Sequence, residues 1–158
     1  MGVRCIVVKC CLKTKRPINP AYPAQLNTLG DHLRKTRLDR GLSQPDVARI
    51  LKVTSNTITT WELNQKEPTA KCAKSIIAFL GYFPFTRNNT TLGKQLYYAR
   101  LITGKTQKQV AKLIDCDTSN LRCIELDERI PQTKLHEKIQ EFINAAFTDY
   151  SMKRNNSE

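Results

Sequence analysis

The feature that most restricts the fold of this chain is an ungapped internal repeat. The stretch from residue 29 to residue 79 recurs at a constant offset of 63 positions, the separation of Leu29 and Leu92. The matches are Leu29-Gly30 with Leu92-Gly93, Leu33 with Leu96, Arg37 with Arg100, Gly41 with Gly104, Gln44 with Gln107, Val47-Ala48 with Val110-Ala111, Ile58 with Leu121, Glu62 with Glu125, Pro68 with Pro131, and Ile76 and Phe79 with Ile139 and Phe142. A long repeat that keeps its register predicts two copies of one structural unit in tandem.

Each copy has the pattern of several short helices. Thr28 and Ser43 each precede an aspartate three residues later, which is the spacing of a capping box, and Thr54 can cap a third helix. The polar loop around Pro68 is followed by an apolar helical face that Gly81 closes. The sequence therefore predicts an all-α fold with four to five short helices in each copy.

The segment SQPDVARILKVTSNTITTWE, from Ser43 to Glu62, contains two of these helices and a tight turn. Its hallmarks are Gly41-Leu42-Ser43-Gln44, Val47-Ala48, Val53, Ser55, Ile58 and Trp61-Glu62. In type and spacing they resemble the helix-turn-helix of the xenobiotic-response-element (XRE) family, the lambda repressor and Cro type. Together with the repeat, the resemblance implies two tandem lambda-repressor-like bundles preceded by a basic N-terminal arm.

The turn before the third helix departs from the family pattern. The family usually places a glycine there, whereas this chain has Lys52 in the first copy and Asp115 in the second. A lysine at positive φ costs about 1 kcal/mol relative to glycine. Aspartate tolerates positive φ better, so the second turn is expected to be less strained.

The predicted organisation has five parts. They are a basic, mostly extended leader (1–27), a first helix-turn-helix domain (28–81), an aromatic connector (82–91), a second helix-turn-helix domain (92–147) and a disordered tail (148–158). The leader is either a solubilising tail or a basic arm that follows DNA phosphates or enters a minor groove. Tyr82, Phe83 and Phe85 make the connector too apolar for a free linker, so it should pack against one or both domains.

A formal net charge of +12 points to a polyanionic partner or an anionic membrane. Residues 29–80 hold nine basic and five acidic residues, whereas 92–143 hold nine and seven, so the positive field is stronger on the first half. No apolar run approaches the roughly 20 residues of a membrane span, and no convincing signal peptide is present. These features predict a cytoplasmic, nucleoid-associated protein.

By the resemblance, two sets of residues are candidates for DNA binding. They are Arg37, Gln44, Ser55, Asn56, Thr59 and Thr60 in the first copy, and Gln107, Thr118, Ser119 and Arg122 in the second. Arg37 would form the family's salt bridge with Glu62, either as a purely structural pair or while also reaching a phosphate. Gln44 would present its side chain and backbone N–H to a phosphate.

The helix near Thr54–Leu63 carries small uncharged polar residues on its outer side, which suits major-groove reading. Asn56 could pair with adenine and threonine methyl groups could contact thymine, although exposed polar residues can also be a plain solvated face. Trp61, three residues after Ile58, is expected in the core. In the second copy Arg122 would suit guanine, so a joint DNA site would be asymmetric. Whether that copy touches DNA, supports the first domain or mediates dimerisation stays open.

The sequence offers little for catalysis or metal binding. Six cysteines form no CxxC pair, which favours free thiols over a metal site. There is no Gly-rich phosphate loop, no HExxH motif and no nucleophile–base set around the two histidines, so we expect neither an enzyme nor a cofactor. His32 and His136 are expected at the surface or its boundary.

The predicted function is that of a sequence-specific regulator of transcription that binds double-stranded DNA and represses by occupying a promoter. It would act as a homodimer or as a monomer with two DNA-binding domains. The alternative is a protein-interaction module, an antitoxin or a transcription adaptor, because one fold serves several functions.

Overall fold

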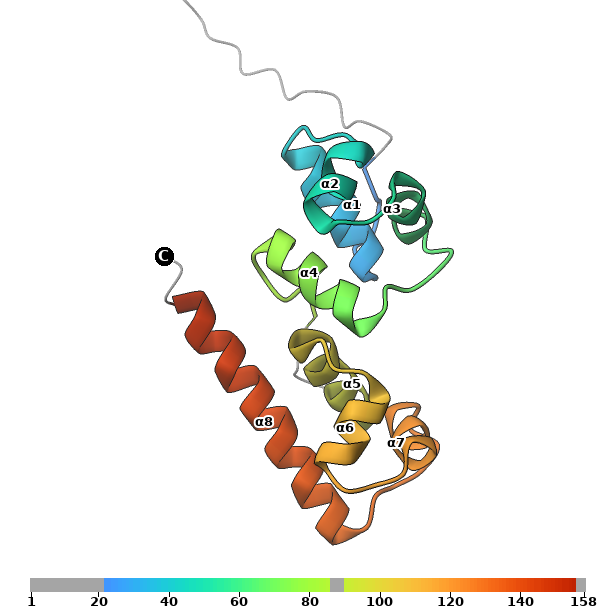
Figure 1. Cartoon of the computed structure of the whole chain (residues 1–158), viewed down its shortest axis with the longest axis vertical. Coiled ribbons are helices and arrows are strands. Elements are labelled where there is room, and N and C mark those ends of the chain that lie inside the picture. The colour runs from blue at the N-terminus through green and yellow to red at the C-terminus, as the bar shows by residue number, and fades with distance from the viewer. Residues whose placement is uncertain (1–21, 86–89, 156–158) are drawn as a thin grey trace, which may run out of the picture.

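A computed structural model describes residues 22–85 and 90–155, and every regular element within these ranges is a helix. The eight helices are α1 (Leu29–Asp39), α2 (Gln44–Leu51), α3 (Ser55–Glu62), α4 (Ala70–Leu80), α5 (Leu92–Thr103), α6 (Gln107–Leu113), α7 (Thr118–Glu125) and α8 (Thr133–Asn155). Figure 1 shows an elongated molecule with α1–α4 at one end, α5–α7 at the other and α8 along one side. The all-α prediction is confirmed for this part of the chain. Most of the predicted leader lies outside it.

The first three helices begin where the side chains of the preceding residues cap them. Thr28 and Ser43 each accept a hydrogen bond from the backbone N–H three residues later, and the aspartate there binds back, so both capping boxes are formed. Thr54 accepts from the backbone N–H of Thr57 at the start of α3. Each cap satisfies a donor that the helix itself leaves unpaired.

Two hydrophobic clusters organise the fold. In the first, Leu33, Val47, Ile58 and Ile76 are fully buried, and Trp61 is only 5% exposed, which confirms its expected place in the core. The second cluster buries Leu96, Val110, Leu121 and Ile139 completely. These four residues stand at the repeat positions of the first four. The helices therefore form a first group, α1–α4, and a second group, α5–α8.

The two groups are joined by an apolar junction. Leu101 and Ile102 of α5 are buried in the cluster of the first group. In the connector, the ring of Phe85 stacks on Tyr98 at 5.1 Å between centroids, and Phe83 meets Phe147 edge to face at 5.9 Å. The described connector residues thus pack against both groups, as their apolar character predicts.

The C-terminal prediction requires a correction. Residues 148–155, expected to be disordered, continue α8 to Asn155. The physical reason is Tyr150, which packs against the first cluster and lies edge to face with Phe83 at 6.3 Å. Residues 156–158 lie outside the described part of the chain.

His32 is a second correction. It is only 7% exposed, not a surface residue, because the connector covers it. Its Nδ1 lies 3.0 Å from the Tyr82 hydroxyl, and its ring makes edge-to-face contacts with the rings of Tyr82 and Phe85. Burial lowers the pKa of His32, while a backbone hydrogen bond to Leu26 and the charge of Asp31 act in the opposite direction. His136 is exposed, as expected.

Candidate nucleic-acid interface

A tight turn connects α2 to α3. Lys52 adopts the left-handed conformation with φ 56° and ψ 46°, and the Val53 N–H donates to the carbonyl oxygen of Ala48 at 2.9 Å. The positive φ expected at Lys52 is therefore present, and Asp115 has φ 58° at the repeat position. The turn sets the direction in which α3 leaves α2.

A buried ion pair fixes the inner side of α3. Arg37 donates from Nε to Oε1 of Glu62 at 2.6 Å and from Nη2 to Oε2 at 2.8 Å, with side-chain exposures of 12% and 2%. Its Nη1 donates to the carbonyl oxygen of Leu42 at 3.1 Å. The hydrogen bond with Glu62 raises the pKa of Arg37 further. The pair therefore ties α1 to the end of α3, and the phosphate contact of Arg37 stays a prediction.

Gln44 belongs to the same network. Its Nε2 donates to Oε2 of Glu62 at 3.0 Å, and its Oε1 accepts from the Thr59 hydroxyl at 2.9 Å. Both ends of the amide are thus held by α3. Gln44 is also the first residue of α2, and its backbone N–H has no acceptor within the helix, so it could meet an anion there. Pro45 has no N–H, and the Asp46 N–H is already bound by the Ser43 hydroxyl oxygen. The phosphate contact of Gln44 stays a prediction, and the structure places its backbone at a suitable position.

The outer face of α3 matches the predicted polar surface. Ser55 and Asn56 are exposed, and Thr59 and Thr60 are partly buried. The Thr60 hydroxyl donates to the carbonyl oxygen of Thr57 at 2.9 Å. Sequence reasoning treated Thr59 only as a base contact and missed that its hydroxyl orients Gln44, because 15 residues separate the two. Among these candidates, Ser55 and Asn56 have the most exposed side chains for reading bases.

The second group repeats this scaffold. Arg100 Nε donates to Oε1 of Glu125 at 2.7 Å, with side-chain exposures of 12% and 5%, and Gln107 Nε2 donates to Oε2 at 2.7 Å. On α7, Thr118, Ser119 and Arg122 are all exposed. Arg122 replaces the threonine that binds the glutamine in the first group. The scaffold is therefore repeated while the outward residues differ.

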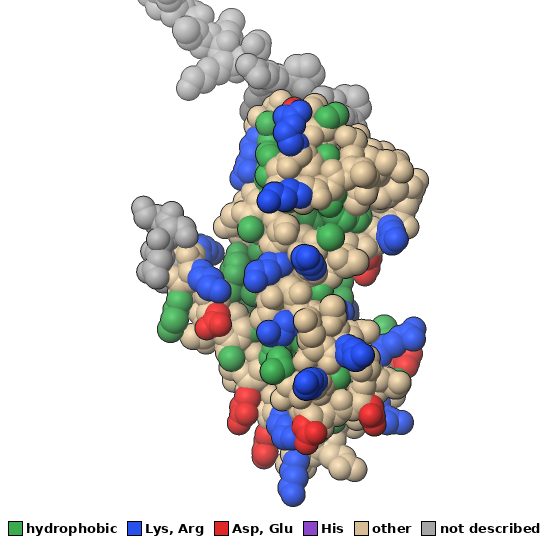
Figure 2. Space-filling model, in the orientation of Figure 1, with side chains coloured by type: hydrophobic (Ala, Val, Ile, Leu, Met, Phe, Trp, Pro, Cys, Tyr) green, Lys and Arg blue, Asp and Glu red, His purple; other side chains and the backbone are tan. Residues whose placement is uncertain are grey.

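The charged side chains are distributed unevenly. In the view of Figure 2, the end formed by the first group shows mostly lysine and arginine, whereas carboxylates are frequent around the other end. The charge counts of the two sequence copies show the same difference. A polyanion would therefore be attracted more strongly to the first group.

Other kinds of site find little support in residues 22–85 and 90–155. Cys72, Cys116 and Cys123 are free thiols, and no group of three metal-ligating side chains occurs there. Burial, followed by the charges of Asp117 and Asp115, raises the pKa of the Cys116 thiol. Cys5, Cys10 and Cys11 lie outside these ranges. Among the described helices, none is long and apolar enough to cross a membrane.

Comparison with known proteins agrees with the first group. Residues 33–85, which extend from α1 through α4 into the connector, match a protein-family model described as Helix-turn-helix. The match supports a helix-turn-helix of the XRE type, a family of DNA-binding regulators that are not normally enzymes. No curated protein and no solved structure matches the chain.

Proposed function

We propose that this protein is a sequence-specific transcriptional repressor that binds double-stranded DNA with α3 in the major groove. The observation that carries the proposal is the two-sided character of α3. Ile58, Trp61 and Glu62 are buried against the first group, whereas Ser55 and Asn56 face solvent. A rigid helix with small polar groups on its open side suits recognition of base edges.

The mechanism begins with contacts to the DNA backbone. The N-terminus of α2, with Gln44 at its first position, would approach a phosphate and set the depth of α3 in the groove. Because Glu62 and Thr59 hold the Gln44 amide, this contact and the base-reading helix are mechanically linked. Repression, of the bacterial or phage type, would follow from occupancy of a promoter, with an affinity for DNA that falls as the salt concentration rises.

The second group is proposed as a second helix-turn-helix, with α7 as its reading helix. The positions of its ion pair and glutamine support this, and α3 and α7 both lie at the right-hand edge of Figure 1. One chain could then contact two successive major grooves about 34 Å apart. Arg122 and Thr59 differ at the matched position, so the combined site would be asymmetric.

Selection of bound sequences from a random DNA duplex pool, with the full chain at moderate salt, tests this proposal. A long asymmetric motif is expected if both groups read DNA, and a short motif would assign reading to one group only. A folded protein that enriches no sequence would contradict the proposed function.

Asn56→Ala tests base reading by α3 directly. It should weaken binding to the selected sequence by about 1–3 kcal/mol, because a bidentate base contact contributes that much to discrimination. Binding to unrelated DNA should hardly change. Ser75→Ala on α4 is the matched control, since Ser75 is exposed but outside the α2–α3 segment. Equal losses on selected and unrelated DNA would refute a base-reading role for Asn56.

One observation favours an interaction role for the second group. Ile130 is a large apolar side chain with an exposure of 91%, and Glu67 stands at its repeat position. Leu113 and Leu126, at 60% and 55%, do not distinguish the groups, because Ile50 and Leu63 at the matching positions are each 53% exposed. A second copy of this chain covering Ile130 would produce a homodimer. Analytical ultracentrifugation of the wild-type chain and of Ile130→Ser tests this. We expect a wild-type dimer that the substitution weakens, and a wild-type protein that is monomeric at all concentrations would exclude the homodimer.

A further inference from the structure

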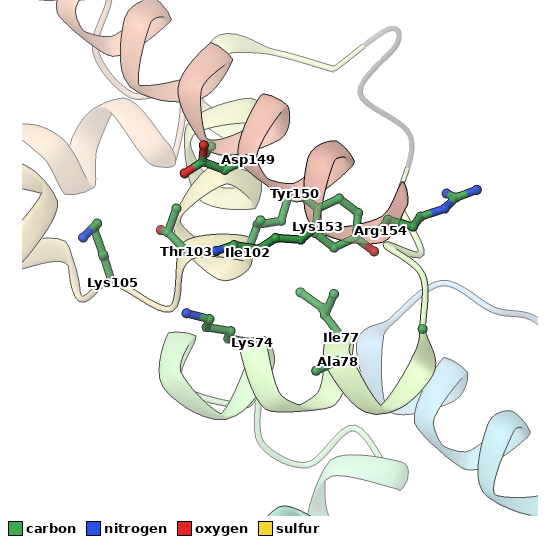
Figure 3. Close-up of a pocket in the computed structure, with 12 residues that line it drawn as sticks. Lys74, Ile77, Ala78, Ile102, Thr103, Lys105, Asp149, Tyr150, Lys153 and Arg154 are labelled. Carbon is green, nitrogen blue, oxygen red and sulfur yellow. The ribbon is translucent and has the colours of Figure 1, made fainter. Parts of the chain in front are cut away.

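A hollow of about 540 Å³ opens at the junction between the two groups, on the side covered by the end of α8. Its wall comes from α4 of the first group and from α5 and α8 of the second (Figure 3). Small-molecule sites in proteins have volumes of about 300–1,000 Å³ and favour such junctions. The hollow belongs to no part of the proposed DNA interface.

The lining combines an apolar floor with a cationic rim. Ile77, Ile102, Ala146 and Tyr150 supply apolar surface. Three lysines and one carboxylate stand around it, namely Lys74, Lys105, Lys153 and Asp149, and the side chain of Arg154 also lines it. A molecule with an apolar body and a single negative charge would match both parts of the lining, because its body leaves water while its charge meets the excess of cations.

One of the cations, Lys74, is held by the packing of the junction. Lys74 crosses from α4 to the end of α5, where its Cδ would lie 2.8 Å from a Cβ atom at Gly104. In Figure 3, Lys74 reaches in from α4 and Lys153 from α8, both on the side of Thr103, whereas the guanidinium of Arg154 points away. An anion near Thr103 would therefore meet charges from both groups.

We propose that this hollow, called the junction site, binds an amphipathic monoanion of the fatty-acid type. Its carboxylate would lie between Lys74 and Lys153, and its hydrocarbon chain would cover Ile77 and Ile102. The bound molecule would contact both groups at once. This goes beyond the proposed function and holds whether or not the chain binds DNA.

Calorimetric titration of the full chain with decanoate tests the junction site. Saturable binding of one decanoate per chain is the expected result. Acetate lacks the apolar body, decanol lacks the charge, and decyltrimethylammonium reverses it, so each should bind at least about tenfold more weakly. Decanol binding as tightly as decanoate, or no saturable binding of decanoate, would overturn the proposal.

Matched variants locate the site. Lys153→Glu should weaken decanoate binding at least about tenfold, while Lys138→Glu, about 22 Å earlier on α8, should leave it within about twofold. Ala78→Phe should fill the hollow from its exposed rim and abolish binding. Ser75→Phe, on the same helix but outside the lining, should not. Circular dichroism verifies that each variant is folded, and equal affinities within either pair would refute the location.

Discussion

The first and second groups of helices share one scaffold but differ on the surfaces that face outward. In both, an arginine on the first helix binds a buried glutamate at the end of the third, at 2.6 Å and 2.7 Å. In both, the loop after that helix binds the N-cap residue of the first one, since the hydroxyls of Thr28 and Thr91 donate to Asn64 and Asp127, each at 2.6 Å. The internal repeat is therefore a repeat of contacts as well as of residues.

The differences concern how firmly the candidate reading helix is held. In the first group, Thr59 binds Gln44 and Thr54 caps α3. In the second group, Arg122 takes the place of the threonine, and Asp117 forms no side-chain bond at the start of α7. The two groups thus share core positions, while the outer face of the second is differently charged and its α7 lacks a side-chain cap.

Removal of the buried glutamate should cause the largest loss of folding stability in each group. Glu62→Ala leaves Arg37 and Gln44 without their acceptor, and Glu125→Ala does the same to Arg100 and Gln107. Breaking such a pair costs about 3–5 kcal/mol, and the similar burial of the two pairs predicts similar losses.

The single tryptophan of the chain makes the two losses separable. Trp61 fluorescence reports urea unfolding of the first group, whereas far-ultraviolet circular dichroism reports both groups. Glu62→Ala should lower the fluorescence midpoint, and Glu125→Ala should act mainly on the dichroism transition. A Glu62→Ala protein as stable as the wild type would show that the pair does not hold α1 to α3.

A smaller loss of stability is expected when a methyl group is added at the glycine where the first and third helices of each group lie against each other. A Cβ at Gly30 would lie 2.0 Å from the carbonyl oxygen of Trp61, and one at Gly93 would lie 2.2 Å from that of Ile124. Neither backbone oxygen can rotate away, so Gly30→Ala and Gly93→Ala should each cost about 3 kcal/mol. Urea titrations with the same two signals measure this, and a neutral Gly93→Ala would break the equivalence of the groups.

The success of sequence reasoning was greatest where contacts are local or repeated. The capping boxes at Thr28 and Ser43, the buried Trp61 and the positive φ at Lys52 were all predictable from short spacings. The capping boxes and the burial of Trp61 depend on residues within a few positions of one another, and the positive φ at Lys52 depends on the tight turn that contains it. The Arg37–Glu62 pair came from the family resemblance, since 25 residues separate the two.

The apolar residues of the connector predict that it packs against its neighbours, but the other contacts across the junction could not be predicted in this way. The tail beyond residue 147 is polar enough to suggest disorder, and only the packing of Tyr150 on Phe83 shows why α8 continues. His32 is buried by a connector that starts 50 residues later. The hollow at the junction could not be predicted for the same reason, because Lys153 and Lys74 line it together only when α8 is helical.

The burial of His32 predicts a pH dependence confined to the first group. Its folded-state pKa is lowered below the usual value near 6.5, so the unfolded chain binds the proton first. Its contribution to stability is complete above pH 6.5 and is lost as the pH falls through that value towards the folded-state pKa. Gln95, at the repeat position, cannot titrate.

Urea midpoints of Trp61 fluorescence at pH 7.5 and 5.5 measure this effect. The drop on acidification should be smaller in His32→Gln than in the wild type, and the difference isolates the histidine from the carboxylates. Identical drops in the two proteins would show that His32 is as easily protonated in the folded chain as in the unfolded one.

The smallest effect is expected at the turns before α3 and α7. Lys52 and Asp115 have φ of 56° and 58°, and a glycine would relieve this conformation. Lys52→Gly should stabilise the first group by up to about 1 kcal/mol. Asp115→Gly should give less, because aspartate tolerates positive φ and its exposed contact with Lys138, at 3.4 Å, contributes little. Urea midpoints measure both, and a larger gain at Asp115 would show that the more strained turn is the one before α7, contrary to the comparison of lysine with aspartate.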